Sequence, residues 1–267
     1  MDAQPQQALP VPLPSPLLRA EDLTLAVPGR VLQQGISFEL QRGEILVLMG
    51  GSGCGKSTLL RHLIGLQTPA AGRVLYGEQD LAEADDDTMA QLRRQFGVMF
   101  QGGALWSSMT VGENVMLPLT EFSELDEDAA EQMARFKLAL VGMEAAFDEL
   151  PSALSGGMKK RAAIARAMAL DPPLLFLDEP SAGLDPLSAA SLDELILNLR
   201  DHLGTSIVLV THELSSIFAV ADRALFLDAK EKTMTALDAP RRLLETGPEA
   251  VRLFLRRGVT SGSGGLA

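Results

Sequence analysis

The stretch LMGGSGCGKSTLL, residues 48–60, limits what this chain can fold into more than any other part of its sequence. Gly50, Gly55, Lys56 and Ser57 satisfy the pattern GxxxxGK followed by Ser or Thr, in which glycines let successive backbone N–H groups form an anion-sized nest. The loop stands between the apolar run EILVLM and a segment with apolar residues at helical spacing. The sequence therefore predicts a buried strand, a phosphate-binding loop and a helix over residues 57–66, rather than an ordinary glycine-rich turn.

The polar residues of this loop have separate expected tasks. Lys56 is placed to reach the β and γ phosphates of a nucleoside triphosphate, and Ser57 to give its hydroxyl oxygen to Mg²⁺. Cys54 is the only cysteine and fits a small spacer in the loop better than a redox switch. The predicted phosphate-binding residues are Gly50, Gly51, Ser52, Gly53, Cys54, Gly55, Lys56, Ser57 and Thr58.

A second apolar run, LLFLDEP at residues 174–180, ends in two carboxylates and a proline. Because the carboxyl ends of parallel strands face the nucleotide, we expect Asp178 to bind Mg²⁺, usually through water. Glu179 can then polarise the attacking water. Adjacent acids seen alone also fit a solvated strand end, and the phosphate loop favours the catalytic interpretation.

Strand and helix patterns alternate along most of the chain. Short strands with a turn at Pro28 and Gly29 are expected before the loop, and RVLYG is expected to be an edge strand before a helix over residues 81–94. Residues 102–154 form a helical insertion, in which Ser123 and Asp126 predict a capping box for a helix over residues 125–141. From Ser155 the alternation returns, which predicts an α/β fold with a largely parallel sheet.

Composition excludes several classes of protein. The net charge of -12 disfavours nonspecific binding to nucleic acid or anionic lipid. No run approaches the roughly 18 apolar residues of a membrane-spanning helix, and the start of the chain lacks the pattern of a secretory signal. We expect a cytoplasmic protein with a disordered Pro-rich tail (1–17), a main domain (18–247, helical subdomain about 102–165) and a C-terminal helix with a flexible tail (248–267).

Between the two phosphate-directed motifs lies LSGGMKKRAAIARAMAL, residues 154–170. Its Ser155, Gly156 and Gly157 form a second anion site at a helix N-terminus, too far along the chain to belong to the first. The cations of residues 159–161 oppose the helix dipole, so they either form a solvated or ion-paired face or lie in the field of a partner's nucleotide.

Two single residues follow predicted strands. His212, in LVTHEL, is either a γ-phosphate sensor or an ordinary surface or capping residue. Gln101, after FGVMF, is uninformative on its own.

Together these residues resemble the nucleotide-binding subunit of an ATP-binding cassette (ABC) transporter over about residues 20–240, most specifically in residues 155–186. The resemblance implies a RecA-like P-loop NTPase core with an antiparallel β-subdomain and an inserted α-helical subdomain. It further implies a head-to-tail dimer that sandwiches two ATP molecules, and a helical subdomain whose groove receives a coupling helix from a membrane permease.

The resemblance also assigns roles to particular residues. Glu179 becomes the general base, His212 the γ-phosphate switch and Asp185 the residue that communicates across the dimer. Gln101 joins Ser57 and Asp178 around Mg²⁺ and links the metal to the helical subdomain. The signature that faces the partner's ATP comprises Ser155, Gly156, Gly157 and Met158.

The sequence departs from the family pattern at two places. Met158 stands where glutamine is commoner. Residues 20–35 contain no aromatic residue to stack on adenine, so Leu25 or Val27, with Arg30 over the base, is the expected substitute.

Variable segments such as QGGALWSSMTVGENVMLPL and VTHELSSIFAVADR resemble the ATPases of Mce/Mla-type lipid transport systems, in which Met158 is itself usual. That branch implies phospholipid transport between the inner and outer membranes, a permease and MCE-domain partner, and a place on the cytoplasmic face of the inner membrane. An amino-acid or small-solute importer ATPase is the alternative within transport. A soluble ABC protein of translation or DNA maintenance is a third hypothesis, which the acidic charge and the single signature disfavour.

Overall fold

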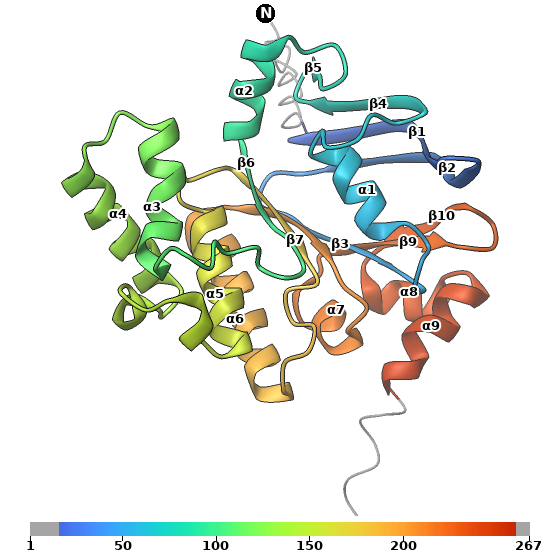
Figure 1. The fold of residues 1–267 in the computed structure, drawn as a ribbon. Helices are drawn as coiled ribbons and strands as arrows, with labels where there is room; N and C mark the ends of the chain where they lie inside the picture. Colours follow the sequence, from blue (N-terminus) through green and yellow to red (C-terminus); the bar gives the residue numbers. More distant parts are fainter. Residues whose placement is uncertain (1–15, 260–267) are drawn as a thin grey trace, which may run out of the picture.

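The computed structural model describes residues 16–259, with side chains up to Arg256, and contains two β-sheets and a separate helical arm (Figure 1). The larger sheet has six strands, which lie in the order β10 (Thr233–Asp238), β9 (Arg223–Asp228), β3 (Ile45–Gly50), β8 (Ser206–Val210), β7 (Leu174–Asp178) and β6 (Phe96–Met99). All of its neighbouring strands are parallel except β9 and β10. The predicted α/β class with a largely parallel sheet is confirmed.

The smaller sheet is antiparallel and has the order β2 (Arg30–Leu40), β1 (Leu18–Val27), β4 (Ala71–Tyr76) and β5 (Gln79–Asp80). The prediction of an edge strand at RVLYG was wrong, because β4 lies between β1 and the short strand β5. The turn between β1 and β2 is where the sequence predicted it, and Gly29 adopts a positive φ of 76° there.

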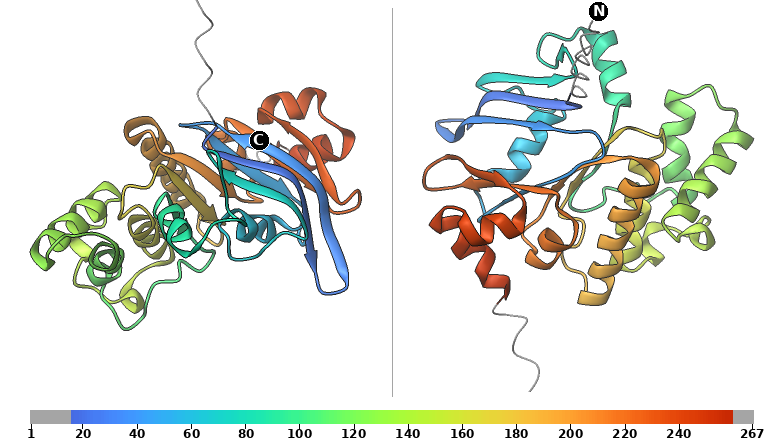
Figure 2. Two further views of the ribbon diagram at one scale, coloured as in Figure 1. Left: turned by 90° about the horizontal axis from the view of Figure 1, so that it is seen from above. Right: turned by 180° about the vertical axis from the view of Figure 1, so that it is seen from behind.

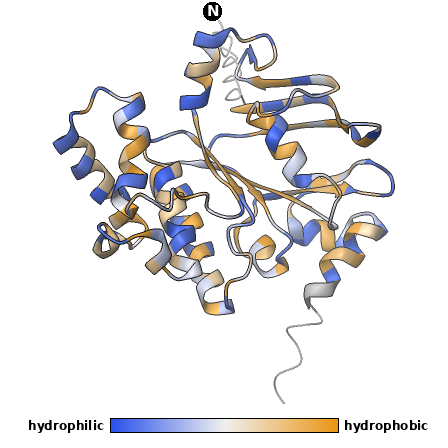
Figure 3. Cartoon of the chain, viewed as in Figure 1, coloured by the Kyte–Doolittle hydropathy of each residue, from blue (hydrophilic) through white to orange (hydrophobic). Residues whose placement is uncertain are grey.

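The parallel strands separate two hydrophobic cores. In β3, Ile45, Val47 and Met49 face one core, whereas Leu46 and Leu48 face the other, as alternation along a strand requires. Helix α1 (Lys56–Leu63) lies in the second core between the two sheets, and α5 (Gly156–Ala167), α6 (Pro186–Leu203) and α7 (Leu214–Val220) cover the opposite face (Figure 1). Burial on both faces explains why the central strands are continuous apolar runs, which Figure 3 shows in orange.

The helical arm projects from one end of the molecule and the C-terminal helices lie at the other, as the view from above in Figure 2 shows. The arm contains α3 (Val111–Phe122), α4 (Glu127–Leu140) and the short 3₁₀ helices η1 (Glu144–Ala146) and η2 (Pro151–Ala153). The C-terminal helices are α8 (Pro240–Thr246) and α9 (Glu249–Val259). None of the helices described is long and apolar enough to cross a membrane.

Two predicted helix starts were wrong because a nearer side chain caps the helix. Asp126 itself is the N-cap of α4 and accepts a hydrogen bond from Ala129 N at 2.9 Å, while Ser123 closes α3. The helix predicted over residues 81–94 begins only at α2 (Asp86–Arg94), where Asp85 accepts from Thr88 N at 2.8 Å. Hydrogen bonding to the side chain of Thr88, and then to its backbone N–H, lowers the pKa of the Asp85 carboxyl.

The predicted Pro-rich tail lies largely outside the described residues; of the predicted C-terminal segment (248–267), the helix is described as α9 (Glu249–Val259) and the tail is not. Of the Pro-rich stretch, only residues 16 and 17 are described, and Leu17 already belongs to the fold, since its N–H donates to Leu40 O at 2.9 Å. The Gly- and Ser-rich end, residues 261–267, is outside the described part altogether.

Candidate functional site

The loop between β3 and α1 lines a cavity of about 620 Å³ at the carboxyl end of the parallel strands. The side chain of Lys56 is nearly buried there, and its Nζ donates hydrogen bonds to Gly50 O at 3.0 Å and Gly51 O at 3.2 Å. The loop therefore folds back on its own lysine, which holds a positive charge at the cavity wall. The loop residues that line the cavity are Gly50, Gly51, Ser52, Gly53, Gly55, Lys56, Ser57 and Thr58.

Two of the glycines are required by the backbone. A Cβ on Gly50 would lie 2.5 Å from Leu227 O and 2.8 Å from Cys54 Sγ, so no larger residue fits without moving β9. Gly55 precedes the helix with φ 105°, a conformation that L side chains rarely adopt. The first residues of α1, Lys56, Ser57 and Thr58, line the cavity, and a helix N-terminus is favourable for binding anions.

Cys54 is buried, and its burial raises the pKa of the thiol. A buried, protonated thiol is a poor nucleophile, which agrees with the interpretation of Cys54 as a spacer. Its carbonyl accepts a hydrogen bond of 2.7 Å from Nε2 of Gln33, and the same nitrogen donates to Asp228 O at 3.0 Å. Gln33 is fully buried, so this side chain ties the phosphate loop to β9.

Asp178 ends β7 beside the loop, and Ser57 Oγ donates to its Oδ1 at 3.3 Å. Burial is the main reason that the pKa of this carboxyl is raised, and the charge of Glu179 raises it further. The Ser57 hydrogen bond and the nearby Lys56 and Arg61 lower it in part. A hydroxyl and a carboxylate thus converge where the loop meets the sheet.

Glu179 follows directly and has an unusual backbone. Its φ is 52°, a left-handed conformation that costs a non-glycine residue on the order of 1–3 kcal/mol and is held by its surroundings. Its N–H donates to Val210 O at 2.8 Å, and its Oε1 lies 2.8 Å from Nδ1 of His212. The other carboxylate oxygen, Oε2, is buried, and no group in the described part of the chain donates a hydrogen bond to it.

Lys160 is a residue of the site that the sequence did not identify. It is nearly buried, and its Nζ donates to Gln101 O and, at 3.1 Å, to Glu179 O. The expectation of a solvated or ion-paired face was therefore wrong for Lys160, because both hydrogen bonds go to backbone carbonyls inside the protein. Arg161, beside it, donates to Val141 O and to Ser191.

The donor set around the phosphate loop fits a divalent cation that is shared with a phosphorylated ligand. Ser57 offers a hydroxyl, Asp178 a carboxylate and Gln101, which lines the cavity, an amide oxygen; such oxygen donors suit Mg²⁺. Within residues 16–259, no group of three or more His, Cys, Asp or Glu side chains could hold a metal by itself. A cation here therefore needs additional oxygens, and phosphate groups in the cavity would supply them.

The predicted adenine contacts are only partly compatible with the structure. Leu25 has no exposed surface, because it points into the core between the sheets, so a base contact at Leu25 was wrong. Val27 and Arg30 are exposed at the tip of the β1–β2 hairpin and do not line the cavity. The apolar side chains that line the cavity are instead Leu32, Leu214 and Phe254. Phe254 packs edge to face on Phe226, with ring centroids 5.4 Å apart.

The second predicted anion site lies apart from the first. Ser155 is the N-cap of α5 and accepts from Met158 N at 3.3 Å, as the sequence predicted for a helix N-terminus. Together with Gly157 and Met158 it lines a separate hollow of about 210 Å³. Asp185 caps α6 and accepts from Leu187 N and Ser188 N. No residue of the phosphate loop lines this hollow.

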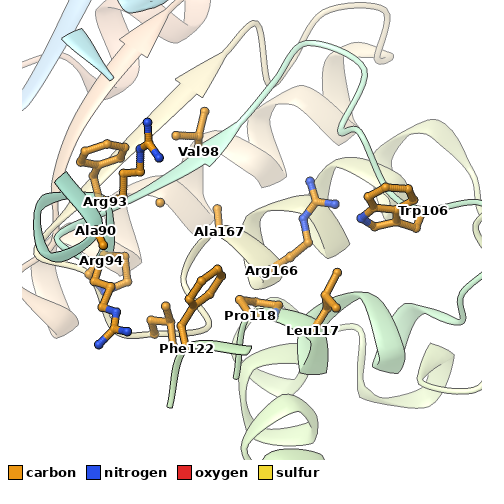
Figure 4. A pocket seen from close by; sticks show the side chains of 14 residues that line it. Ala90, Arg93, Arg94, Val98, Trp106, Leu117, Pro118, Phe122, Arg166 and Ala167 are labelled. Carbon is orange, nitrogen blue, oxygen red and sulfur yellow. The ribbon is translucent and has the colours of Figure 1, made fainter. Parts of the chain in front are cut away.

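A further hollow of about 460 Å³ lies between the helical arm and the sheet (Figure 4). Trp106, Leu117 and Phe122 line it from the side of the arm, and Arg93 and Arg94 of α2 from the other side. Arg166 and Ala167 of α5 also contribute to its wall. Trp106 and Phe122 are more than half exposed, so a sizeable apolar surface is accessible here.

This geometry defines a P-loop ATPase: a phosphate loop between β3 and a helix, a histidine after the neighbouring strand β8 and a carboxylate pair at the end of β7, the next strand, all at one edge of a largely parallel sheet. The family described as "ABC transporter" matches residues 33–182. The chain belongs to the ABC transporter family and is an ATPase.

Relatives extend the match over most of the chain. It is 35% identical over 240 residues to the intermembrane phospholipid transport system ATP-binding protein MlaF of Haemophilus influenzae, covering 90% of both chains. It is 35% identical to MlaF of Escherichia coli K12, covering 90% of this chain and 88% of that one. It is also 36% identical to the probable ribonucleotide transport ATP-binding protein mkl of Mycobacterium leprae, covering 89% of this chain and 68% of that one.

Solved structures agree with the fold. The dimeric ATP-binding cassette MJ0796, in a post-hydrolysis state bound to ADP and Pi, matches with a TM-score of 0.75 and 27% identity over 83% of this chain and 98% of that one. The cbiO1 protein of Clostridium perfringens, part of the ABC transporter complex cbiONQ, matches with a TM-score of 0.77 and 27% identity, covering 90% of this chain and 99% of that one.

Proposed function

We propose that this chain hydrolyses ATP to drive the transport of phospholipids between membranes through a separate permease. The observation that carries the lipid assignment is the 35% identity to two MlaF proteins over nearly their whole lengths. Similarity to mkl, named for probable ribonucleotide transport, favours nucleotide transport as a second candidate. An amino-acid or small-solute importer remains the more general alternative.

Hydrolysis begins with water held against the γ-phosphate. Lys56 binds the β and γ phosphates, and Glu179 takes the proton of the water through Oε2, which is the buried oxygen without a partner. The new bond joins the water oxygen to the γ phosphorus, and the bond to the bridging oxygen of ADP breaks, giving ADP and phosphate. His212 holds Oε1 of Glu179 and contacts the γ-phosphate.

Bound Mg²⁺ neutralises charge on the phosphates, and we propose that Ser57, Gln101 and Asp178 hold it. Ionised Asp178 supplies the negative charge of that donor set. Its Ser57 hydrogen bond keeps the hydroxyl and the carboxylate on the same side of the loop.

A second copy of the chain completes each site. Ser155, Gly156, Gly157 and Met158 would face the ATP of the partner copy, and Asp185 would lie at the dimer contact. Support comes from the separation of the signature hollow from the phosphate loop within one chain, and from the exposure of Ser155 and Gly156. The ABC cassette MJ0796 is dimeric in its solved structure.

The hollow beside the helical arm is proposed to receive a coupling helix of the permease. Its apolar floor and its arginines, Arg93 and Arg94, suit a helix that carries aromatic or aliphatic side chains next to acidic ones. The ATPase would then sit on the cytoplasmic face of the inner membrane, with an MCE-domain protein among the further partners.

Affinity purification of the tagged full-length chain from its own membranes tests the transport assignment. A permease recovered together with an MCE-domain protein is the expected result. Recovery of a permease with a solute-binding protein and no MCE-domain protein would overturn lipid transport. Tight binding of the purified chain to RNA or DNA at physiological salt would revive a role outside transport.

A further inference from the structure

Helix α5 carries two cations that both bind the loop after β6. Lys160 donates to Gln101 O, and Arg166, six residues further along the helix, donates to Gly103 O at 2.9 Å and Ala104 O at 2.7 Å. The loop is therefore fixed to one helix at two points. Because Arg166 also lines the hollow beside the helical arm, this helix connects that hollow to Gln101 and Glu179, which line the ATP cavity.

Lys160 makes a second contact that Arg166 lacks. Its Nζ also donates to Glu179 O at 3.1 Å. One ammonium therefore binds the main chain of Gln101, in the loop, and the main chain of Glu179, the proposed base. Burial lowers the pKa of this ammonium, whereas the charges of Glu179 and Asp178 raise it. A nearly buried cation held by two carbonyls on separate segments fixes their separation.

The backbone at both ends needs such support. Ala104 and Glu179 have φ values of 50° and 52°, and few non-glycine residues among those described adopt this left-handed conformation. The carbonyl of Ala104 is bound by Arg166 and the carbonyl of Glu179 by Lys160. Lys160 and Arg166 therefore each bind the carbonyl of a non-glycine residue in the left-handed conformation.

We infer that Lys160 is a positioning residue for hydrolysis, which sets Glu179 relative to Gln101. It acts through the backbone of both residues and does not itself contact the nucleotide. This role rests on the proposed assignment of Glu179 as the base. Loss of the ammonium should release the backbone of Glu179 while the phosphate loop, held by Lys56 and Gln33, stays intact.

The test compares Lys160→Met and Lys160→Arg with the full-length parent chain. For each protein, kcat for ATP hydrolysis, the Kd of a fluorescent ATP analogue and the melting temperature are measured. We expect Lys160→Met to lose at least tenfold in kcat with a Kd within twofold of the parent value. Lys160→Arg, which retains the charge and the donors, should recover most of the lost rate.

Lys137→Met is the matched control, because Lys137 is also a buried lysine but its ion pair, with Asp171, lies at the opposite end of β7 from Asp178. The control should melt at a lower temperature and keep the parental kcat. The positioning role is wrong if Lys160→Met keeps its kcat within twofold, if its kcat and affinity fall in proportion, or if Lys160→Arg is no better than Lys160→Met. An inactive parent chain would instead overturn the proposed function and, with it, this role.

Discussion

Replacing Glu179 by glutamine isolates the proton transfer from nucleotide binding. The amide has the shape of the carboxylate and keeps an acceptor oxygen for Nδ1 of His212, and the backbone bond from Glu179 N to Val210 O is unaffected. What is lost is the basic oxygen at the buried position of Oε2. Because a positioned general base contributes about 10²- to 10⁴-fold, we expect the barrier to rise by about 3–5 kcal/mol and kcat to fall accordingly.

Nucleotide binding should survive, since the hydrogen bonds that hold the phosphate loop in the described part of the chain involve Lys56, Ser57 and Gln33, and none of them goes to Glu179. ATP at about 100 times its Kd adds about 2.7 kcal/mol to the free energy of unfolding. For a domain of this size, about 2–4 °C per kcal/mol converts this to about 5–10 °C in melting temperature. Parent and variant should show the same ATP-dependent increase.

The assay pairs steady-state phosphate release with thermal melting, with and without ATP and Mg²⁺. Glu213→Gln is the control, because that carboxylate lies 3.7 Å from the other nitrogen of His212 and is about half exposed outside the cavity. It should keep the parental rate. Hydrolysis by Glu179→Gln at the parental rate would refute the base assignment, and loss of the ATP-dependent melting shift would refute the separation of chemistry from binding. With hydrolysis blocked, this variant should also form an ATP-dependent dimer in size-exclusion chromatography.

Three further predictions concern single residues. Lys56→Ala should lose nucleotide binding or hydrolysis, and full turnover in a phosphate-release assay would contradict its role. Gln33→Met leaves the buried carbonyls of Cys54 and Asp228 without their donor, at a cost of about 1–3 kcal/mol each, which is partly offset because Oε1 of Gln33 is itself buried without a partner. Urea unfolding should show a free energy of unfolding lower by about 2–4 kcal/mol, together with weaker ATP binding. Unchanged stability would contradict the role of Gln33 in holding the loop. The pKa of Asp178 is raised on folding, so the contribution of this carboxyl to the free energy of unfolding falls as pH rises from 3.8 through the folded pKa. Without nucleotide, Asp178→Asn should therefore unfold at a higher urea concentration than the parent at pH 7, and the difference should be smaller near pH 4. The variant should also lose ATPase activity. If Asp178→Asn were less stable than the parent at pH 7, the expected destabilising effect of the ionised Asp178 would be wrong.

Local sequence was sufficient for many elements. As predicted, the phosphate loop follows β3 and precedes α1, and Ser155 lies at the N-terminus of α5, where it caps the helix. Gly204 closes α6 in the left-handed conformation. Each of these depends on the conformational preference of one residue and on the apolar pattern of its neighbours. The start of α4 was misplaced because Ser123 and Asp126 both have side chains that cap helices, and the choice between them depends on where α3 ends.

The site was predicted less evenly. His212 and Glu179 were identified by their places after apolar strands, and the structure brings them into hydrogen-bond contact. Gln33 and Phe254 gave no recognisable signal, and Lys160 was marked only as one of three cations that oppose the helix dipole. Their partners could not be predicted because the contacts join segments far apart in the chain, such as Gln33 with Asp228. Leu25 was wrongly assigned to adenine because its burial depends on how the two sheets pack.

The sequence by itself determined the nucleotide-binding class of this protein, since the glycines, Lys56 and the carboxylates that end β7 act through backbone conformation and side-chain chemistry that short motifs encode. Tertiary structure alone decided which side chains support that chemistry: a buried glutamine that holds the loop, a buried lysine that joins two carbonyls, and a signature that lies apart from the loop of its own chain. The physical reason is that a buried polar group is stable only with its partners, and those partners are chosen by packing between distant segments.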